Sequence, residues 1–455
     1  MSEPTPVNVL RGHKSQIHAA TFVRGNDRLA TGDADGYVIL WDLAIMRPKA
    51  VWRAHENAIL AIRAWGSDKI ITHGRDHRLA VWQLRAEDEE VLASTAPLER
   101  TADTFPQPWM LHVLDVNTMN FCAFAACPSS PGANATLAED TSDSILIAVP
   151  NTLLAESIDI SELPSQKRIH TVKPGEKHGM AMTLAILHKQ NHLIVIAGFE
   201  NGMCSVFVLS ENTHEWVTTY CSTAHSQPVL SLDSDVRGEY FISSAADALI
   251  VKHPVPIAPQ TTTPGIAPSI KQALTSYAGA SSLPKAPTGI GALFAAEQGT
   301  TKGGNDVAAQ LNAKPWQDPI KSLNTKHSGQ QSLTLRSDGR VFATAGWDSK
   351  IRVYATKSLN ELAVLKWHPV GVYAAAFAGI KTESTDASSS TVEVNSTQEM
   401  QAIQQNNSGA LTSKLAGAVG TQAMTVKGRR LHHAKHTHWL VAGAKDGKLS
   451  LWDIY

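Results

Sequence analysis

Short runs of alternating apolar and polar residues, separated by clusters of turn-forming residues, begin close to the start of the chain. Three such runs occur at residues 17–23, 28–32 and 37–43, and the breaks between them, at 24–27 and 33–36, hold Gly, Asn and Asp. Alternating runs bounded in this way are typical of antiparallel strands joined by tight turns. The stretch therefore predicts a small β-meander, opened by Gly12-His13 and closed by Trp41-Asp42.

The same unit recurs one period later. His55 and Trp82 follow His13 and Trp41 by 42 and 41 positions, and in both copies a threonine, an aspartate and the tryptophan are spaced by four and then six positions. A Gly-His pair and a Trp-Asp pair at this distance mark one blade of a WD40 β-propeller, whose period is about 40–45 residues. One blade cannot bury both of its faces, so further copies are expected.

Five more units, some degenerate, complete the pattern. We therefore expect an all-β fold, a single seven-bladed WD40 β-propeller over residues 1–455. In the weak third unit, alignment of Phe124 with Phe22 places Asp115 where His13 stands, with strands at 144–149 and 153–160. The chain ends just after Trp452-Asp453, and a ring leaves sheet edges exposed unless its ends meet. Residues 7–10 are therefore predicted to pair with residues 448–454.

Two long stretches interrupt the later blades, at residues 254–314 and 381–433, and a shorter polar loop occupies 128–141. Segments so rich in small and polar residues cannot bury enough apolar surface to offset the entropy lost on ordering. They are predicted to be largely disordered insertions between strands, with short helices at 270–277 and 290–298.

The repeated polar positions can satisfy one another's hydrogen bonds. The Gly-His turn and the Asp turn lie at one end of a blade, so the imidazole can bridge the carboxylate and the threonine hydroxyl, which in turn reaches the indole N–H. Because a buried polar group without a partner costs about 1–3 kcal/mol, such pairing stabilises the blade. The predicted networks are His13–Thr31–Asp35–Trp41, His55–Thr72–Asp76–Trp82 and His327–Thr344–Asp348–Tyr354. A catalytic role is disfavoured, because these groups are spread around a ring whereas catalysis needs one convergent site.

Composition narrows the function classes further. The formal net charge is −1, which gives no overall positive field to attract nucleic acid or an anionic membrane. Four cysteines in 455 residues do not make a disulfide framework and indicate a reducing compartment. We expect no secretory leader and no membrane-spanning run, and we find no P-loop and no G-x-S-x-G element in the sequence. We expect an intracellular, non-enzymatic protein with no cofactor and no metal.

Two sets of residues are candidates for partner binding. The position before each turn aspartate is predicted to face solvent and holds Ala34, Arg75, Trp347 and Lys445. Trp and Arg are enriched in binding hot spots, which makes Arg75 and Trp347, together with Lys445, candidate partner contacts. Packing of Trp347 against a neighbouring turn is the alternative. The second set is the basic, histidine-rich run at 427–438, which we interpret as a solvated basic loop. The alternatives are a nuclear-import signal, a contact with an acidic partner and a metal site.

Three blocks carry a family resemblance: VLRGHKSQIHAATF at 9–22, HENAILAI at 55–62 and WLVAGAKDGKLSLWDIY at 439–455. With the long later insertions, the chain resembles the fungal ASTRA-associated protein 1 family, which is similar to animal G-protein β-subunit-like proteins. The resemblance implies a nuclear scaffold subunit of the ASTRA complex, with the cytoplasm as a second location. It also implies partners among Ruv-B-like ATPases, PI3-kinase-related kinases and their maturation factors, and a link to chromatin remodelling.

The WD repeats alone leave other functions open. They also suit a substrate receptor of a ubiquitin ligase or a G-protein β-like signalling adaptor. A phosphoinositide-binding propeller is a further alternative, but that class resembles a pattern carrying F-R-R-G, and here the sequence offers only Gly428-Arg429-Arg430-Leu431.

Overall fold

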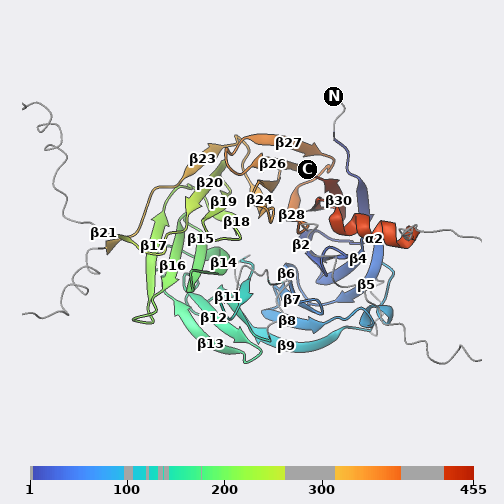
Figure 1. Ribbon diagram of the computed structural model, residues 1–455, viewed down its shortest axis with the longest axis horizontal. Helices are drawn as coiled ribbons and strands as arrows, with labels where there is room; N and C mark the ends of the chain where they lie inside the picture. The colour runs from blue at the N-terminus through green and yellow to red at the C-terminus, as the bar shows by residue number, and fades with distance from the viewer. Residues whose placement is uncertain are drawn as a thin grey trace, which may run out of the picture.

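Seven four-stranded antiparallel sheets surround a central axis in the computed structural model, which confirms the predicted all-β propeller (Figure 1). The structure describes residues 4–96, 106–118, 122–131, 137, 143–175, 177–261, 313–380 and 425–454. Most of the two long predicted insertions, at 262–312 and 381–424, and the helices predicted at 270–277 and 290–298 lie outside the described residues. Within the described ranges there is no helix that is both long and apolar enough to cross a bilayer.

The blades are numbered in chain order, and each begins with its strand nearest the axis (Figure 1). Blade one contains β2 (Ile17–Val23), β3 (Arg28–Asp33), β4 (Tyr37–Asp42) and β5 (Arg47–Arg53). Blade two contains β6 (Ile59–Trp65), β7 (Lys69–Gly74), β8 (Arg78–Gln83) and β9 (Trp109–Asp115). Blade three contains β10 (Ala125–Pro128), β11 (Ile145–Pro150), β12 (Ile158–Leu163) and β13 (Lys167–Val172). Blade four contains β14 (Ala181–Lys189), β15 (His192–Phe199), β16 (Cys204–Leu209) and β17 (Trp216–Ser222).

The remaining blades follow the same plan. Blade five contains β18 (Val229–Ser234), β19 (Tyr240–Ala245), β20 (Leu249–Pro254) and β23 (Lys321–Asn324). Blade six contains β24 (Gln330–Leu335), β25 (Val341–Gly346), β26 (Lys350–Ala355) and β27 (Glu361–Lys366). Blade seven contains β28 (Val372–Phe377), β29 (Trp439–Ala444), β30 (Lys448–Asp453) and β1 (Asn8–Arg11). A two-stranded pair, β21 (Gln260–Thr261) and β22 (Ala313–Lys314), brackets residues 262–312, and a 3-10 turn, η1 (Asp88–Glu90), follows β8.

The N-terminal strand closes the ring as predicted. β1 pairs antiparallel with β30, with Asn8 opposite Leu451 and Arg11 opposite Lys448. The amide of Val7 also donates to the carbonyl of Leu451 at 2.8 Å. Because β1 supplies the outer strand of blade seven, the first and last segments of the chain complete one sheet.

The hydrophobic core lies between successive blades. One cluster joins Ile17 and Leu29 of blade one to Val441 and Leu449 of blade seven, all fully buried. Strand residues alternate between the two faces of a sheet, so each blade presents apolar side chains to both neighbours. This packing explains why the repeat is needed: no blade buries its two faces without the next.

The third blade differs from its prediction. Asp115 belongs to β9, the outer strand of blade two, where it lies opposite Arg78. The strand predicted at 153–160 begins only at Ile158. The reason is a wide turn, in which Asn151 Oδ1 accepts hydrogen bonds from the amides of Leu153 and Leu154 at 2.8 and 2.9 Å.

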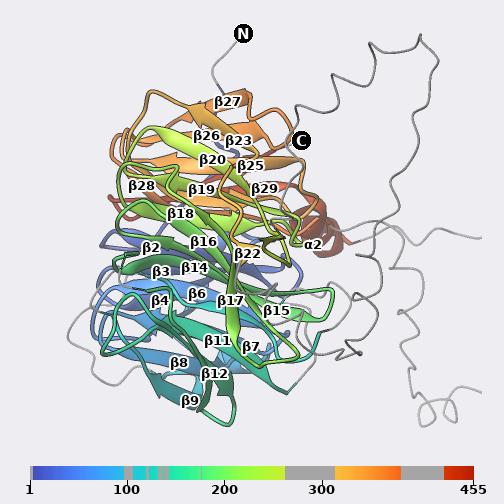
Figure 2. The ribbon, with the colours of Figure 1, turned by 90° about the vertical axis from the view of Figure 1, so that its left-hand side faces the viewer.

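The two ends of the ring are different. One end, here called the short-turn face, carries the tight turns at 33–37, 74–78, 245–249, 346–350 and 444–448. The opposite end, here called the insertion face, is where β8, β10, β20 and β28 end before long connections. Helix α2 (Val426–His436) lies at this face (Figure 2).

Helix α2 contradicts the expectation of an irregular basic loop at the end of the 381–433 insertion. The Thr425 hydroxyl caps the helix by accepting from the amide of Gly428 at 3.1 Å, and basic residues fill the last turn, where they suit the helix dipole. Ala434 is buried, its carbonyl accepts from Trp439 Nε1 at 3.0 Å, and Lys435 pairs with Asp27 at 3.2 Å. Arg429 and Arg430 remain exposed.

Candidate functional site

Blade two brings the predicted residues together. His55 Nδ1 lies 2.9 Å from Asp76 Oδ1, and His55 Nε2 lies 2.8 Å from Thr72 Oγ1. Trp82 Nε1 donates to the same hydroxyl at 2.8 Å. Asp76 also accepts from the amide of Glu56 at 3.0 Å, so its carboxylate ties the turn to the loop that carries the histidine.

In blade one the acid is Asp33, and the prediction of Asp35 is wrong. His13 Nδ1 lies 2.8 Å from Asp33 Oδ2, while His13 Nε2 and Trp41 Nε1 lie 2.7 and 2.8 Å from Thr31 Oγ1. The reason lies at the end of the second strand. The corresponding residue in blade two is Gly74, which leaves room beside the imidazole for an aspartate two residues later. In blade one that space is filled by the Asp33 side chain itself.

Blade six departs from the predicted network altogether. The His327 side chain is 43% exposed and its Nδ1 lies 3.9 Å from Asp348, and Thr344 donates instead to Gln330 Oε1 at 2.7 Å. Asp348 binds the buried Arg352 at 2.6 Å, and Tyr354 stacks on Phe342. The indole of Trp347 covers Gly329, which leaves no space for a side chain there. Gln330 then fills the position that the imidazole would take.

A longer buried network in blade five was only partly visible in the sequence. His225 lies 3.2 Å from Asp247 and 2.8 Å from Ser243, and Ser243 contacts His253 at 2.7 Å. His253 stands where other blades place tryptophan, and its second nitrogen meets the Tyr220 hydroxyl at 2.7 Å. Tyr220 comes from blade four, so no spacing within the repeat could have indicated it.

The blade-five network is better suited to stabilising the blade than to binding a metal or to catalysis. Cys204 lies beside His225 and His253, with one potential ligand atom from each within 4.8 Å of the others. Both nitrogens of each imidazole already have hydrogen-bond partners, and burial raises the pKa of the Cys204 thiol to about 12. Burial also lowers the pKa of His253 well below its usual value, so the ring is neutral. The network therefore matches a set of satisfied buried polar groups.

Blade seven uses the facing strand to supply its hydroxyl. Ser450 on β30 meets His368 Nε2 and Trp452 Nε1, each at 2.8 Å. The residue opposite it on β29 is Ala442, which has no hydroxyl to offer. The hydrogen bonds from histidine and tryptophan to a hydroxyl are thus kept, although the hydroxyl comes from β30 and not from β29.

Three proposed contact residues hold equivalent places on the short-turn face. The amides of Arg75, Trp347 and Lys445 each donate to the carbonyl of a residue that precedes an inner strand, at 2.9, 3.0 and 3.0 Å. Arg75 and Lys445 are exposed, and Trp347 is 47% exposed although its indole packs on Gly329. Its Nε1 donates to Gln331 Oε1 at 2.9 Å, which fixes the ring. The face thus presents a rigid aromatic group and two cations.

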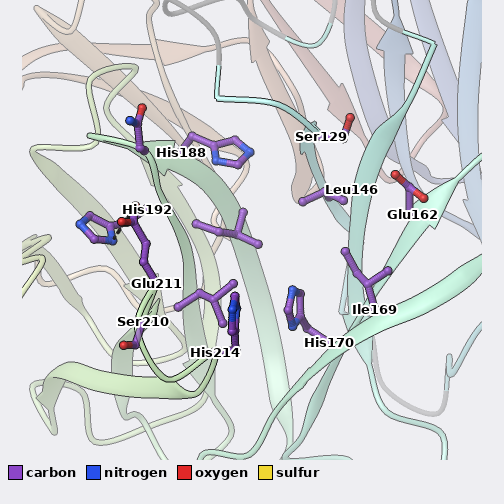
Figure 3. A pocket seen from close by; sticks show the side chains of 13 residues that line it. Ser129, Leu146, Glu162, Ile169, His170, His188, His192, Ser210, Glu211 and His214 are labelled. Atoms are coloured by element: carbon purple, nitrogen blue, oxygen red, sulfur yellow. Dashed lines mark ion pairs between the residues drawn. The ribbon is translucent and has the colours of Figure 1, made fainter.

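A cavity of about 350 Å³ lies between blades three and four at the insertion face (Figure 3). Leu146, Ile169, Leu193 and Leu209 supply its apolar surface. Four histidines line it as well, His170 from β13, His188 and His192 from the β14–β15 hairpin and His214 from the turn after β16. Their positions in the sequence follow no common spacing, and for this reason the cavity was not predicted.

Known proteins match this chain over nearly its whole length. The family model described as ASTRA-associated protein 1 matches residues 6–452. ASTRA-associated protein 1 of Verticillium alfalfae is 46% identical, over 99% of this chain and 93% of its own length. The protein of the same name from Pyricularia oryzae is 44% identical over 99% of this chain and 97% of its length, and that of Schizosaccharomyces pombe is 29% identical over 83% and 94%.

The fold and the blade networks define a seven-bladed propeller of the WD-repeat class, with polar groups that join the strands of each blade. Within that class, the match over nearly the full length is decisive. The chain belongs to the ASTRA-associated protein 1 family.

Proposed function

We propose that the chain is a non-catalytic subunit of the ASTRA complex and binds partner proteins through its short-turn face. The observation that supports this most is the exposed Trp347 at the same place in its blade as Arg75 and Lys445 in theirs. Tryptophan and arginine dominate binding hot spots because they combine a large contact area with hydrogen-bond donors. Membership of the family supports the assignment to the complex.

The polar residues of the blades support a scaffold in preference to an enzyme. Their imidazoles, hydroxyls and carboxylates are bonded to one another within each blade, which leaves them committed to the fold. Through the complex, the proposed role extends to chromatin remodelling in the nucleus and to maturation of PI3-kinase-related kinases together with Ruv-B-like ATPases.

Affinity purification of the tagged full-length chain from its own organism tests this function. The triple variant Trp347→Ala, Arg75→Glu, Lys445→Glu is expected to lose ASTRA subunits that the wild type recovers in quantitative mass spectrometry. The variant Arg85→Glu, Arg237→Glu changes exposed residues on the opposite face, outside the basic run at 427–438, and serves as the matched control. Full recovery with the triple variant would contradict the assignment of the face, and recovery of cullin adaptors without ASTRA subunits would contradict the assignment of the complex.

A further inference from the structure

The histidine-lined cavity offers an excess of hydrogen-bond acceptors. His188 Nε2 lies 3.0 Å from the carbonyl oxygen of Pro128, and because a carbonyl only accepts, this nitrogen carries the proton. Its Nδ1 is then a bare acceptor, buried and without a hydrogen-bond partner among the described residues. His192 Nδ1 is likewise buried without such a partner, and its nearest charged neighbour, Glu211 Oε1, is 3.9 Å away. A buried acceptor of this kind calls for a donor.

The charge of the residues that line the cavity also favours a ligand that donates hydrogen bonds. It contains two carboxylates, Glu162 and Glu211, and no lysine or arginine among the described lining residues. Burial lowers the pKa of His170 and of His188, so both rings are neutral at pH 7 and add no positive charge. The cavity is therefore suited to a cationic group that only donates hydrogen bonds.

The arrangement of the rings selects a planar cation. His214 and His170 lie next to one another in the lower part of Figure 3, and both rings are seen nearly edge-on. A flat group can stack on the face of such a ring, and Glu211 stands on the same turn as His214. A guanidinium is planar, stacks on aromatic faces, carries five donors and binds carboxylates with two parallel hydrogen bonds. Lysine offers a compact point charge and no flat surface.

We propose that this cavity receives an arginine side chain from a partner protein. The guanidinium stacks on the ring of His214 and donates to Glu211 and to the neighbouring His192 Nδ1, while the apolar stem lies along Leu193 and Leu209. A volume of about 350 Å³ is within the usual range for ligand sites and accommodates one long side chain. The inference rests on the proposed function, because it names the chemistry of a partner, but it concerns the opposite face of the ring.

Titration of the full-length chain with Nα-acetyl-arginine methylamide tests the proposal. With ¹³C-labelled histidine rings, saturable shifts are expected at His170 and His214. The neutral citrulline analogue should produce none, and the lysine analogue should bind more weakly. Glu211→Gln should weaken arginine binding about tenfold, as expected from the loss of one charge-assisted contact. Glu215→Gln removes an exposed charge from the same hairpin outside the lining, and should leave binding unchanged.

Three outcomes would overturn the proposal. They are the absence of saturable shifts, equal binding of citrulline, and equal effects of the Glu211 and Glu215 variants. Equal binding of the lysine and arginine analogues would overturn the claim that the cavity prefers a planar cation, and with it the assignment to arginine. Trp347→Ala is expected to leave these shifts unchanged, so a failure of the proposed short-turn interface is seen separately from a failure of the arginine site.

Discussion

Replacement of Asp33 by alanine should destabilise the ring far more than the same change at Asp35. The Asp33 side chain is 3% exposed and accepts three hydrogen bonds, from His13 Nδ1 at 2.8 Å and from the amides of Asp35 and Tyr37 at 3.0 Å each. Asp33→Ala removes these acceptors and leaves the buried imidazole N–H unpaired. Removal of one partner of a buried pair usually costs about 3–5 kcal/mol, and we expect a loss in this range.

Asp35→Ala is the matched control, one turn position away. The side chain of Asp35 is only half-buried, and the contact of its backbone carbonyl with Arg53 survives the substitution. We expect a loss below about 1 kcal/mol, as for other partly exposed charges. Urea unfolding followed by tryptophan fluorescence measures both variants, with an unchanged m value showing that the unfolding transition itself is the same. Equal losses, or a larger loss for Asp35→Ala, would refute the assignment of Asp33.

Three further changes probe other parts of the ring. Leu10→Ala opens a cavity at the closing strand, where Leu10 is 2% exposed, and should lower the free energy of unfolding by about 2–5 kcal/mol; an unchanged melting temperature would contradict closure by β1. Arg352→Ala leaves Asp348 without its 2.6 Å partner and should cost about 2–3 kcal/mol in urea unfolding, with a negligible loss counting against the pair. Burial lowers the pKa of His368 to about 4, so its neutral form is favoured in the fold and stability should fall as the pH drops from about 6.5 to 4. His368→Gln should reduce that slope by up to about 1.4 kcal/mol per pH unit, and an identical slope in both proteins would exclude this histidine as the cause.

The architecture was predictable because its signals repeat. A histidine, a threonine, an aspartate and a tryptophan that recur at one period, together with alternating strands, indicated blades one and two, and β1 could be paired with β30 from the need to close the ring. Blade three lacks this recurring set of residues, and the turn built around Asn151 takes up residues that the alternation assigned to a strand. Helix α2 is polar over most of its length, so its helical character depends on a cap and on one buried alanine, and not on an apolar stripe.

The sequence predicted that polar networks of this type would be present, but it did not always predict which residues form them. Spacing alone could not distinguish Asp33 from Asp35, because the choice depends on whether a glycine ends the second strand, as Gly74 does in blade two. In blade six the place of the histidine passes to Gln330, which spacing again could not reveal. The histidine-lined cavity depends on contacts between two blades, and such contacts appear only once the chain has folded.

Oxidative footprinting of the chain, free and within its purified native complex, tests the central claim most directly. Trp347 is 47% exposed in the free ring and therefore open to labelling. If the short-turn face binds the partner subunits, Trp347 should be strongly protected in the complex while exposed residues of α2 on the opposite face keep their labelling. Equal labelling of Trp347 in both states would contradict the claim that this face joins the complex.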